Sequence, residues 1–130
     1  FVTLFILMIP IYITILHLLH NEIIRKLKYR KFKIKCSIQI DNKIIKGYGY
    51  YDTGNGLLYQ NTPVIFIKGS PINNQGQVIN VSGINETIFT YLAYKGKLTI
   101  KKNILDVFVV FIGKKHNFFN CNFLLNKYVL

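Results

Sequence analysis

The chain has 130 residues, of which 51% are hydrophobic, 17 are Lys or Arg and 5 are Asp or Glu. This length suits one compact domain with its own core, and the apolar content excludes a mainly disordered protein. Two cysteines are too few for a disulfide-stapled small domain or a four-cysteine zinc site, and the three histidines form no cluster with them. We therefore expect no metal site and no cofactor.

The net charge of +12 comes from 15 lysines and only two arginines, all of them after position 24. Ile and Asn are also abundant, and this combination is typical of a low-GC coding bias that raises the pI without any selected partner. A nucleic-acid-binding protein would favour Arg, which contacts phosphate and guanine in bidentate fashion. We therefore expect no nucleic-acid partner, and the charge supports an acidic partner only weakly.

Residues 1–20 predict a transmembrane helix. The first 19 carry no charge, and at about 1.5 Å per residue a helix of this length nearly spans the hydrocarbon core of a bilayer. The segment is apolar on every face, unlike a soluble core helix, and it lacks the basic start and cleavage site of a signal peptide. Because the sequence begins with Phe, we expect this helix to be the last of several membrane segments.

Residues 21–31 form a basic junction that contains Arg25, Lys26, Lys28, Arg30 and Lys31. Lys and Arg beside a membrane segment mark its cytoplasmic side, where anionic lipid attracts them. Free thiols at Cys36 and Cys121 fit the same reducing compartment. The sequence therefore predicts a protein of the cell membrane that contacts lipid and whose following domain faces the cytoplasm.

Residues 32–130 predict an all-β domain. Apolar and polar residues alternate over 32–40, and a turn at Asp41-Asn42 leads to a second strand over 43–51. Many short strands separated by turn signals are typical of a sandwich or barrel. Further strands are predicted at 64–68, 78–81, 87–94, 98–100 and 105–112, with a polar loop at 69–77, a turn at 95–97 and a short helix at 120–125.

The segment Asp52-Thr53-Gly54 follows an aromatic strand, as the active-site loop of aspartic peptidases does. There the carboxylate is half of a pair that shares one proton and activates a water, Thr hydrogen-bonds within and across paired loops, and Gly lets the backbone turn beside the substrate. The tripeptide alone is equally compatible with a surface turn. The apolar residues Leu57 and Leu58 and the apolar strand at 64–68 favour the active-site interpretation.

One carboxylate cannot act as both acid and base. Two neighbouring carboxylates can, because their pKa values split so that one is protonated while the other is ionised. The remaining acids lack the Thr-Gly context: they are Glu22, Asp41, Glu86 and Asp106. The second carboxylate would therefore be Asp52 of another copy across a two-fold axis, so the motif predicts a homodimer.

The sequence resembles the sporulation sigma-E factor-processing peptidases. The resemblance lies in the membrane-anchored start, the basic junction, the motif Asp52-Thr53-Gly54-Asn55, and then Leu58 and Pro63-Val64. It is specific over residues 52–64 and looser over 40–130, where it includes 94–98 and 121–126. The family usually continues the motif with a Leu and an Asp-Pro pair, where this chain has residues 56–61.

The resemblance implies a membrane-anchored aspartic endopeptidase with a retroviral-protease-like domain, that is, a half-barrel of the pepsin type that acts as a homodimer. Its protein substrate would be a pro-sigma factor processed during sporulation. Asp52 would be the catalytic residue, and its active-site loop would comprise Thr53, Gly54 and Asn55. A glycine-containing hairpin tip would form the flap over the substrate, made of Ser82, Gly83, Ile84 and Asn85.

Two alternatives stay open on the sequence alone. The chain would be a non-catalytic, membrane-anchored β-domain that binds an acidic partner through its lysines, or a peptidase fold that has lost its activity and binds partners only. In the first of these, neutral substitution of Asp52 would be silent and binding would weaken steeply with salt.

Overall fold

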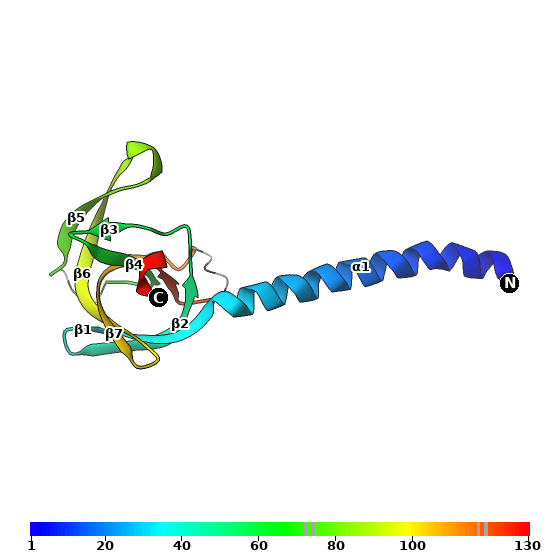
Figure 1. Cartoon of the computed structure of the whole chain (residues 1–130), viewed down its shortest axis with the longest axis horizontal. Coiled ribbons are helices and arrows are strands. Elements are labelled where there is room, and N and C mark those ends of the chain that lie inside the picture. Colours follow the sequence, from blue (N-terminus) through cyan, green and yellow to red (C-terminus); the bar gives the residue numbers. More distant parts are fainter. Residues whose placement is uncertain (72, 74, 117, 119) are drawn as a thin grey trace. The chain divides into compact units, whose positions relative to one another are not determined.

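The computed structural model in Figure 1 describes residues 1–130 except 72, 74, 117 and 119; the side chains of residues 29 and 84 are also outside the description. The chain divides into two units, Phe1–Phe32 and Lys33–Leu130, and each is described by itself. The elements in chain order are α1 (Val2–Phe32), β1 (Lys33–Ile40), β2 (Lys43–Tyr51), β3 (Leu58–Tyr59), β4 (Thr62–Lys68), β5 (Gln77–Ser82), the 3-10 turn η1 (Ile84–Glu86), β6 (Ile88–Ile100), β7 (Asn103–Ile112), β8 (Phe123–Leu125) and the 3-10 turn η2 (Lys127–Val129).

Helix α1 joins the apolar segment and the basic junction in one run of 31 residues. By length and composition it is long and apolar enough to cross a membrane. The basic junction is helical because it consists largely of good helix formers, and Glu22 pairs with Lys26 one turn later at 3.2 Å. Pro10 lies inside the helix, where Thr14 Oγ1 donates a hydrogen bond of 2.8 Å to the Pro10 carbonyl.

Six strands of the second unit form a closed barrel. Their order is β1-β2-β8-β4-β7-β6, and β6 returns to pair with β1. Neighbouring strands are antiparallel except for β2 with β8 and β4 with β7, which are parallel. The short β8 therefore lies between β2 and β4 although it comes near the end of the chain. The mostly β architecture predicted for this part of the chain is confirmed.

Apolar side chains at every second position fill the barrel. Five of its strands contribute to one buried cluster, which includes Ile38 and Leu98, both 0% exposed, and Phe123; β2 packs its partly buried Ile45 against this cluster. Alternation is the pattern expected for a strand with one face inside a barrel and the other outside. It explains why the period-two segment at 32–40 correctly predicted β1.

A second apolar cluster covers the outer face of β4 and β7. It contains Val64 and Phe66 of β4, Phe108 of β7, and Ile79 and Val81 of β5. Strands β4 and β7 are therefore buried on both faces, which accounts for their nearly continuous apolar sequences. Burial on two faces leaves no polar alternation for these strands to display.

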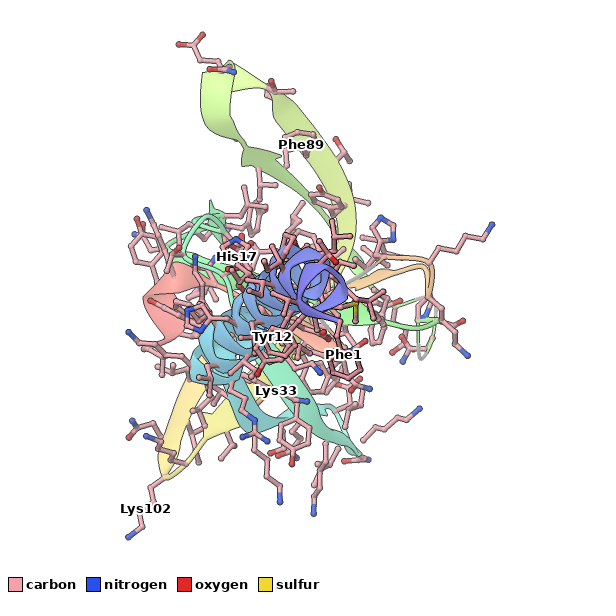
Figure 2. The ribbon with its side chains drawn as sticks, turned by 90° about the vertical axis from the view of Figure 1, so that its right-hand side faces the viewer. Phe1, Tyr12, His17, Lys33, Phe89 and Lys102 are labelled. Carbon is pink, nitrogen blue, oxygen red and sulfur yellow. The ribbon has the colours of Figure 1, made fainter. Side chains whose placement is uncertain are left out.

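Strand β5 and the first half of β6 form a hairpin that projects from the barrel (Figure 1). Figure 2 shows Phe89 on this hairpin and Lys102 at the β6–β7 turn, on opposite sides of the barrel. The outward face of the hairpin carries the exposed apolar residues Val78 and Ile88, which are 64% and 70% accessible.

Two local predictions were wrong. Residues 95–97 do not turn: β6 runs through Gly96, which is a glycine because a Cβ there would lie 3.1 Å from the Gln39 carbonyl on β1. Residues 120–125 contain no helix; Phe123–Leu125 form β8, because pairing with β2 and β4 outweighs the local preference. The sequence also gave no sign of β3, which pairs with β4 through a two-residue turn at Gln60 and Asn61.

Burial inside the barrel predicts how two matched substitutions differ. Ile38→Ala should lower the free energy of unfolding by about 2–5 kcal/mol, because Ile38 is completely buried and its removal leaves a cavity. Ile44→Ala on the neighbouring strand, where the side chain is 57% exposed, should change it by less than about 0.5 kcal/mol. Urea unfolding of the full chain in detergent, followed by tyrosine fluorescence, measures both. Equal losses would contradict the inward placement of Ile38.

Candidate active site

Strand β2 ends at Tyr51, and the next residue, Asp52, begins a tight loop. The Gly54 amide donates a 2.9 Å hydrogen bond to Asp52 Oδ1, and the Asn55 amide donates a 3.1 Å bond to the Asp52 carbonyl. A Cβ on Gly54 would lie 3.2 Å from Oδ1, so glycine allows the carboxylate to fold back over its own loop. Asp52 is half-buried, with its carboxylate oriented by backbone and still reachable from solvent.

Thr53 does not contribute to this orientation within one chain. Its side chain is exposed, and its hydroxyl makes no hydrogen bond to any residue that the structure describes. The motif predicts contacts of this threonine within and across paired loops. The contact within the loop is absent from the described chain, and the hydroxyl is exposed for a contact with another molecule.

Asn55 is a buried residue that hydrogen-bonds the loop to neighbouring strands. Only 7% of its surface is exposed, and its Nδ2 donates to the carbonyls of Val64 at 3.3 Å and Leu125 at 3.4 Å. Its Oδ1 accepts from the Leu57 amide at 3.3 Å. A buried amide is stabilising only when its donors and acceptor are satisfied, as they are here. Asn55 thus ties the residues after Asp52 to both β4 and β8.

The end of the chain packs against the same loop. The Lys127 amide donates 2.8 Å to the Asn55 carbonyl, and Tyr51 Oη donates 2.9 Å to the Lys127 carbonyl. Asn126 is 0% exposed and its Nδ2 donates 2.7 Å to the Leu57 carbonyl. These residues were not predicted as part of the site, and the resemblance over 121–126 was the only signal near them.

The candidate flap lies at the tip of the β5–β6 hairpin. The Gly83 amide donates 2.7 Å to the Thr87 carbonyl, and a Cβ on Gly83 would lie 2.6 Å from the Phe89 ring. Ser82 and Asn85 are exposed, and Asn85 has a left-handed φ of 70°. The side chain of Ile84 lies outside the described residues.

No hydrogen bond joins the described part of this tip to the Asp52 loop. The two regions are connected instead through the outer apolar cluster, against which Leu57 and Tyr59 pack beside Ile79 and Val81. The structure therefore brings Asp52, Gly54 and Asn55 together in one hydrogen-bonded loop and leaves the hairpin tip separate from it.

Asp41, the carboxylate of the β1–β2 hairpin, lies too far from Asp52 to pair with it within one chain. Asp41 precedes β2 and Asp52 follows it, so about 30 Å of extended strand separates them. Asp41 instead lines a polar pocket with Asp106, Lys95 and Lys97. Among the described residues, no three His, Cys, Asp or Glu side chains gather as a metal site would require.

Both cysteines are buried thiols, and neither forms a disulfide with a described residue. Burial raises the pKa of the Cys36 thiol to about 11, since the charged thiolate is poorly solvated there. Burial also raises the pKa of Cys121. Neither thiol is therefore prepared to act as a nucleophile near neutral pH.

Comparison with protein-family models gives no match, and comparison with curated proteins gives no significant one. The resemblance to the sigma-E factor-processing peptidases therefore depends on the sequence motif alone.

The close approach of β8 to β2 makes Gly49 sensitive to substitution. A Cβ at this position would lie 2.7 Å from Leu125, which is itself completely buried. Gly49→Ala should therefore lower the free energy of unfolding by about 1–3 kcal/mol. Gly113→Ala, where nothing lies within 4 Å of the added carbon, should change it by less than about 0.5 kcal/mol.

A double-mutant cycle with Leu125→Ala tests the cause of this effect. Removal of the Leu125 side chain leaves room for the new methyl group, so the two losses should sum to more than the loss in the double variant. Strict additivity in urea unfolding of the four proteins would contradict the contact.

Proposed function

We propose that this chain is a membrane-anchored aspartic endopeptidase that hydrolyses a peptide bond with Asp52. The observation that carries the proposal is the environment of the Asp52 carboxylate, that is, its exposure and its hydrogen bonds. It is half-exposed at the end of a barrel strand, accepts a hydrogen bond from Gly54, and sits on a loop anchored by the buried Asn55. An ordinary surface turn needs no buried amide linking it to two strands of the core.

The proposed mechanism requires two copies of the chain. Asp52 of each protomer would contribute one carboxylate to a dyad that shares a proton, so that one group activates water while the other donates a proton to the substrate carbonyl. Because no partner carboxylate is expected from the same chain, the dyad would form across a two-fold axis. The exposed hydroxyl of Thr53 is suited to a contact between the paired loops.

The proposed location and substrate follow from the N-terminal helix and the sequence resemblance. Helix α1 would anchor the barrel to the cell membrane, with its basic final turns on the cytoplasmic side. The substrate would be a cytoplasmic protein with an extended segment, of which a pro-sigma factor is the candidate implied by the resemblance. The β5–β6 hairpin would close over that segment as a flap.

The exposed lysines support a second candidate function. Among the described residues the only ion pair joins Lys26 to Glu22 in α1, so the lysines of the barrel have no carboxylate partner there. A non-catalytic domain that binds an acidic partner would use this surface. Its binding would weaken steeply with salt and would not depend on Asp52.

Substitution of Asp52 separates the two functions. Cleavage of a co-expressed pro-sigma factor by the full chain should fall at least about 100-fold in Asp52→Asn, since the dyad loses its ionisable group. Asp106→Asn, which removes an exposed aspartate that lacks the Thr-Gly context, should leave cleavage unchanged. The product is measured by immunoblot and its new terminus by mass spectrometry.

A pooled synthetic peptide library is tested in parallel with purified protein in nanodiscs. Cleavage of library peptides without cleavage of the pro-sigma factor would reject that substrate and retain the peptidase. Cleavage of neither by a wild-type protein shown to be dimeric would reject the peptidase.

The shared dyad makes a further quantitative prediction. When wild type and Asp52→Asn are co-expressed in equal amounts, random pairing leaves only about one quarter of dimers with two native carboxylates. Cleavage activity per total protein should therefore fall to about one quarter of the wild-type value. A fall to one half would indicate that each chain acts by itself.

A further inference from the structure

Two buried asparagines from distant parts of the chain meet behind the Asp52 loop. Asn55 and Asn126 both donate through Nδ2 to the carbonyl of Val64, at 3.3 Å and 3.2 Å. They are also the buried polar residues of the described chain. Burying two amides against one carbonyl is costly unless their remaining groups are also satisfied.

Those groups are satisfied by the loop and by the end of the chain. Asn126 Nδ2 also donates 2.7 Å to the Leu57 carbonyl, and its Oδ1 accepts 3.0 Å from the Tyr128 amide. No buried side-chain nitrogen or oxygen among the described residues lacks a partner. Asn126 therefore joins three segments: the end of the Asp52 loop, the start of β4 and the turn η2.

Two donors meet at the end of the loop, because the Leu57 carbonyl accepts from the Val64 amide at 3.0 Å as well as from Asn126 Nδ2 at 2.7 Å. Leu57 is the last residue before β3, and its backbone amide donates to Oδ1 of Asn55. The backbone amide of Asn55 in turn donates to the Asp52 carbonyl. A displacement of Leu57 would thus shift Asn55 and, with it, Asp52. The bond from Gly54 to Asp52 Oδ1 is local and orients the carboxylate within the loop, but it does not fix the loop to the barrel.

We propose that Asn126 is a positioning residue for Asp52, which holds the loop against the barrel through its two donor bonds to Leu57 and Val64. Asn126 does not touch the reacting atoms; it acts through Leu57 and Asn55. The inference rests on the proposed peptidase function for its catalytic consequence, whereas its structural consequence, a rigid loop, does not depend on activity.

Two substitutions isolate the donor bonds. Asn126→Leu keeps the approximate size and removes all the polar contacts. Asn126→Asp keeps the acceptor for the Tyr128 amide and removes both donors; on protonation the carboxylic acid regains one donor. Ile38→Ala is the control, because it weakens the same barrel without contact to the loop.

The first measurement is hydrogen exchange by mass spectrometry on the full chain in nanodiscs. In Asn126→Leu, amides of residues 53–57 should exchange at least 10-fold faster, while amides of β1 should keep their wild-type rates. In Ile38→Ala, amide exchange at residues 53–57 should not rise selectively over exchange in β1. Unchanged exchange over 53–57 in Asn126→Leu would overturn the inference, whether or not the protein cleaves a substrate.

The second measurement is the rate of cleavage per folded molecule, with the library peptide that the wild type cuts best. Asn126→Leu should lower kcat 10- to 100-fold and change KM less than 3-fold, whereas Ile38→Ala should change neither. Asn126→Asp should recover part of its kcat as the pH falls and the new carboxyl group gains its proton. A merely structural role would produce no such pH-dependent recovery.

The outcomes distinguish the two proposals. A wild-type kcat retained in Asn126→Leu would overturn the positioning role and leave the peptidase function intact. If the wild type cleaves nothing, the peptidase function fails, and the exchange rates alone decide whether Asn126 holds the loop.

Discussion

The insertion of β8 between β2 and β4 determines what surrounds Asp52. Three residues close to the end of the chain complete the barrel wall, in parallel with one neighbour and antiparallel to the other. Because Tyr51 pairs with Leu125, the residue after each strand end comes to the same place. Asp52 and Asn126 therefore leave the sheet side by side, and the loop that carries the carboxylate is packed against the last turn of the chain.

This arrangement reconciles two requirements that usually conflict. A catalytic carboxylate has to be reachable from solvent, yet groups at an exposed turn are seldom held in one geometry. Here the exposed residues Thr53 and Gly54 are followed by the buried Asn55, which lies beside the buried Asn126. The side-chain amides of these two asparagines donate hydrogen bonds to the backbone carbonyls of Leu57, Val64 and Leu125. Rigidity comes from bonds that span more than 60 residues of sequence, while the loop itself remains short.

The sequence predicted the parts of the fold whose signal is local. Alternation marked β1, and continuous apolar runs marked β4 and β7, because burial on one face or on two leaves a different pattern. It failed where pairing partners decide the structure. Strand β8 is too short to show a period, and Gly96 suggested a turn although the close approach of β1 is what requires it.

The residues of the candidate site also differ in how far the sequence could predict them. The motif Asp52-Thr53-Gly54 could be proposed as a site from the sequence because its residues are consecutive. Asn126 could not, since an asparagine near a chain end has no local feature that distinguishes a buried donor from a solvated side chain. The position of Asn126 beside the Asp52 loop depends on the parallel pairing of β2 with β8, which no single segment encodes.

The register of β1 on β2 sets how close the first residue of the barrel lies to the candidate site. Strand β1 begins at Lys33, and Lys33 pairs with Tyr50 on β2. A strand spacing of about 5 Å and two further residues therefore place the Asp52 Cα within about 12 Å of Lys33. The point where the chain enters the barrel and the carboxylate thus belong to one strand pair, so a shift of that register would move Asp52 relative to the entry point.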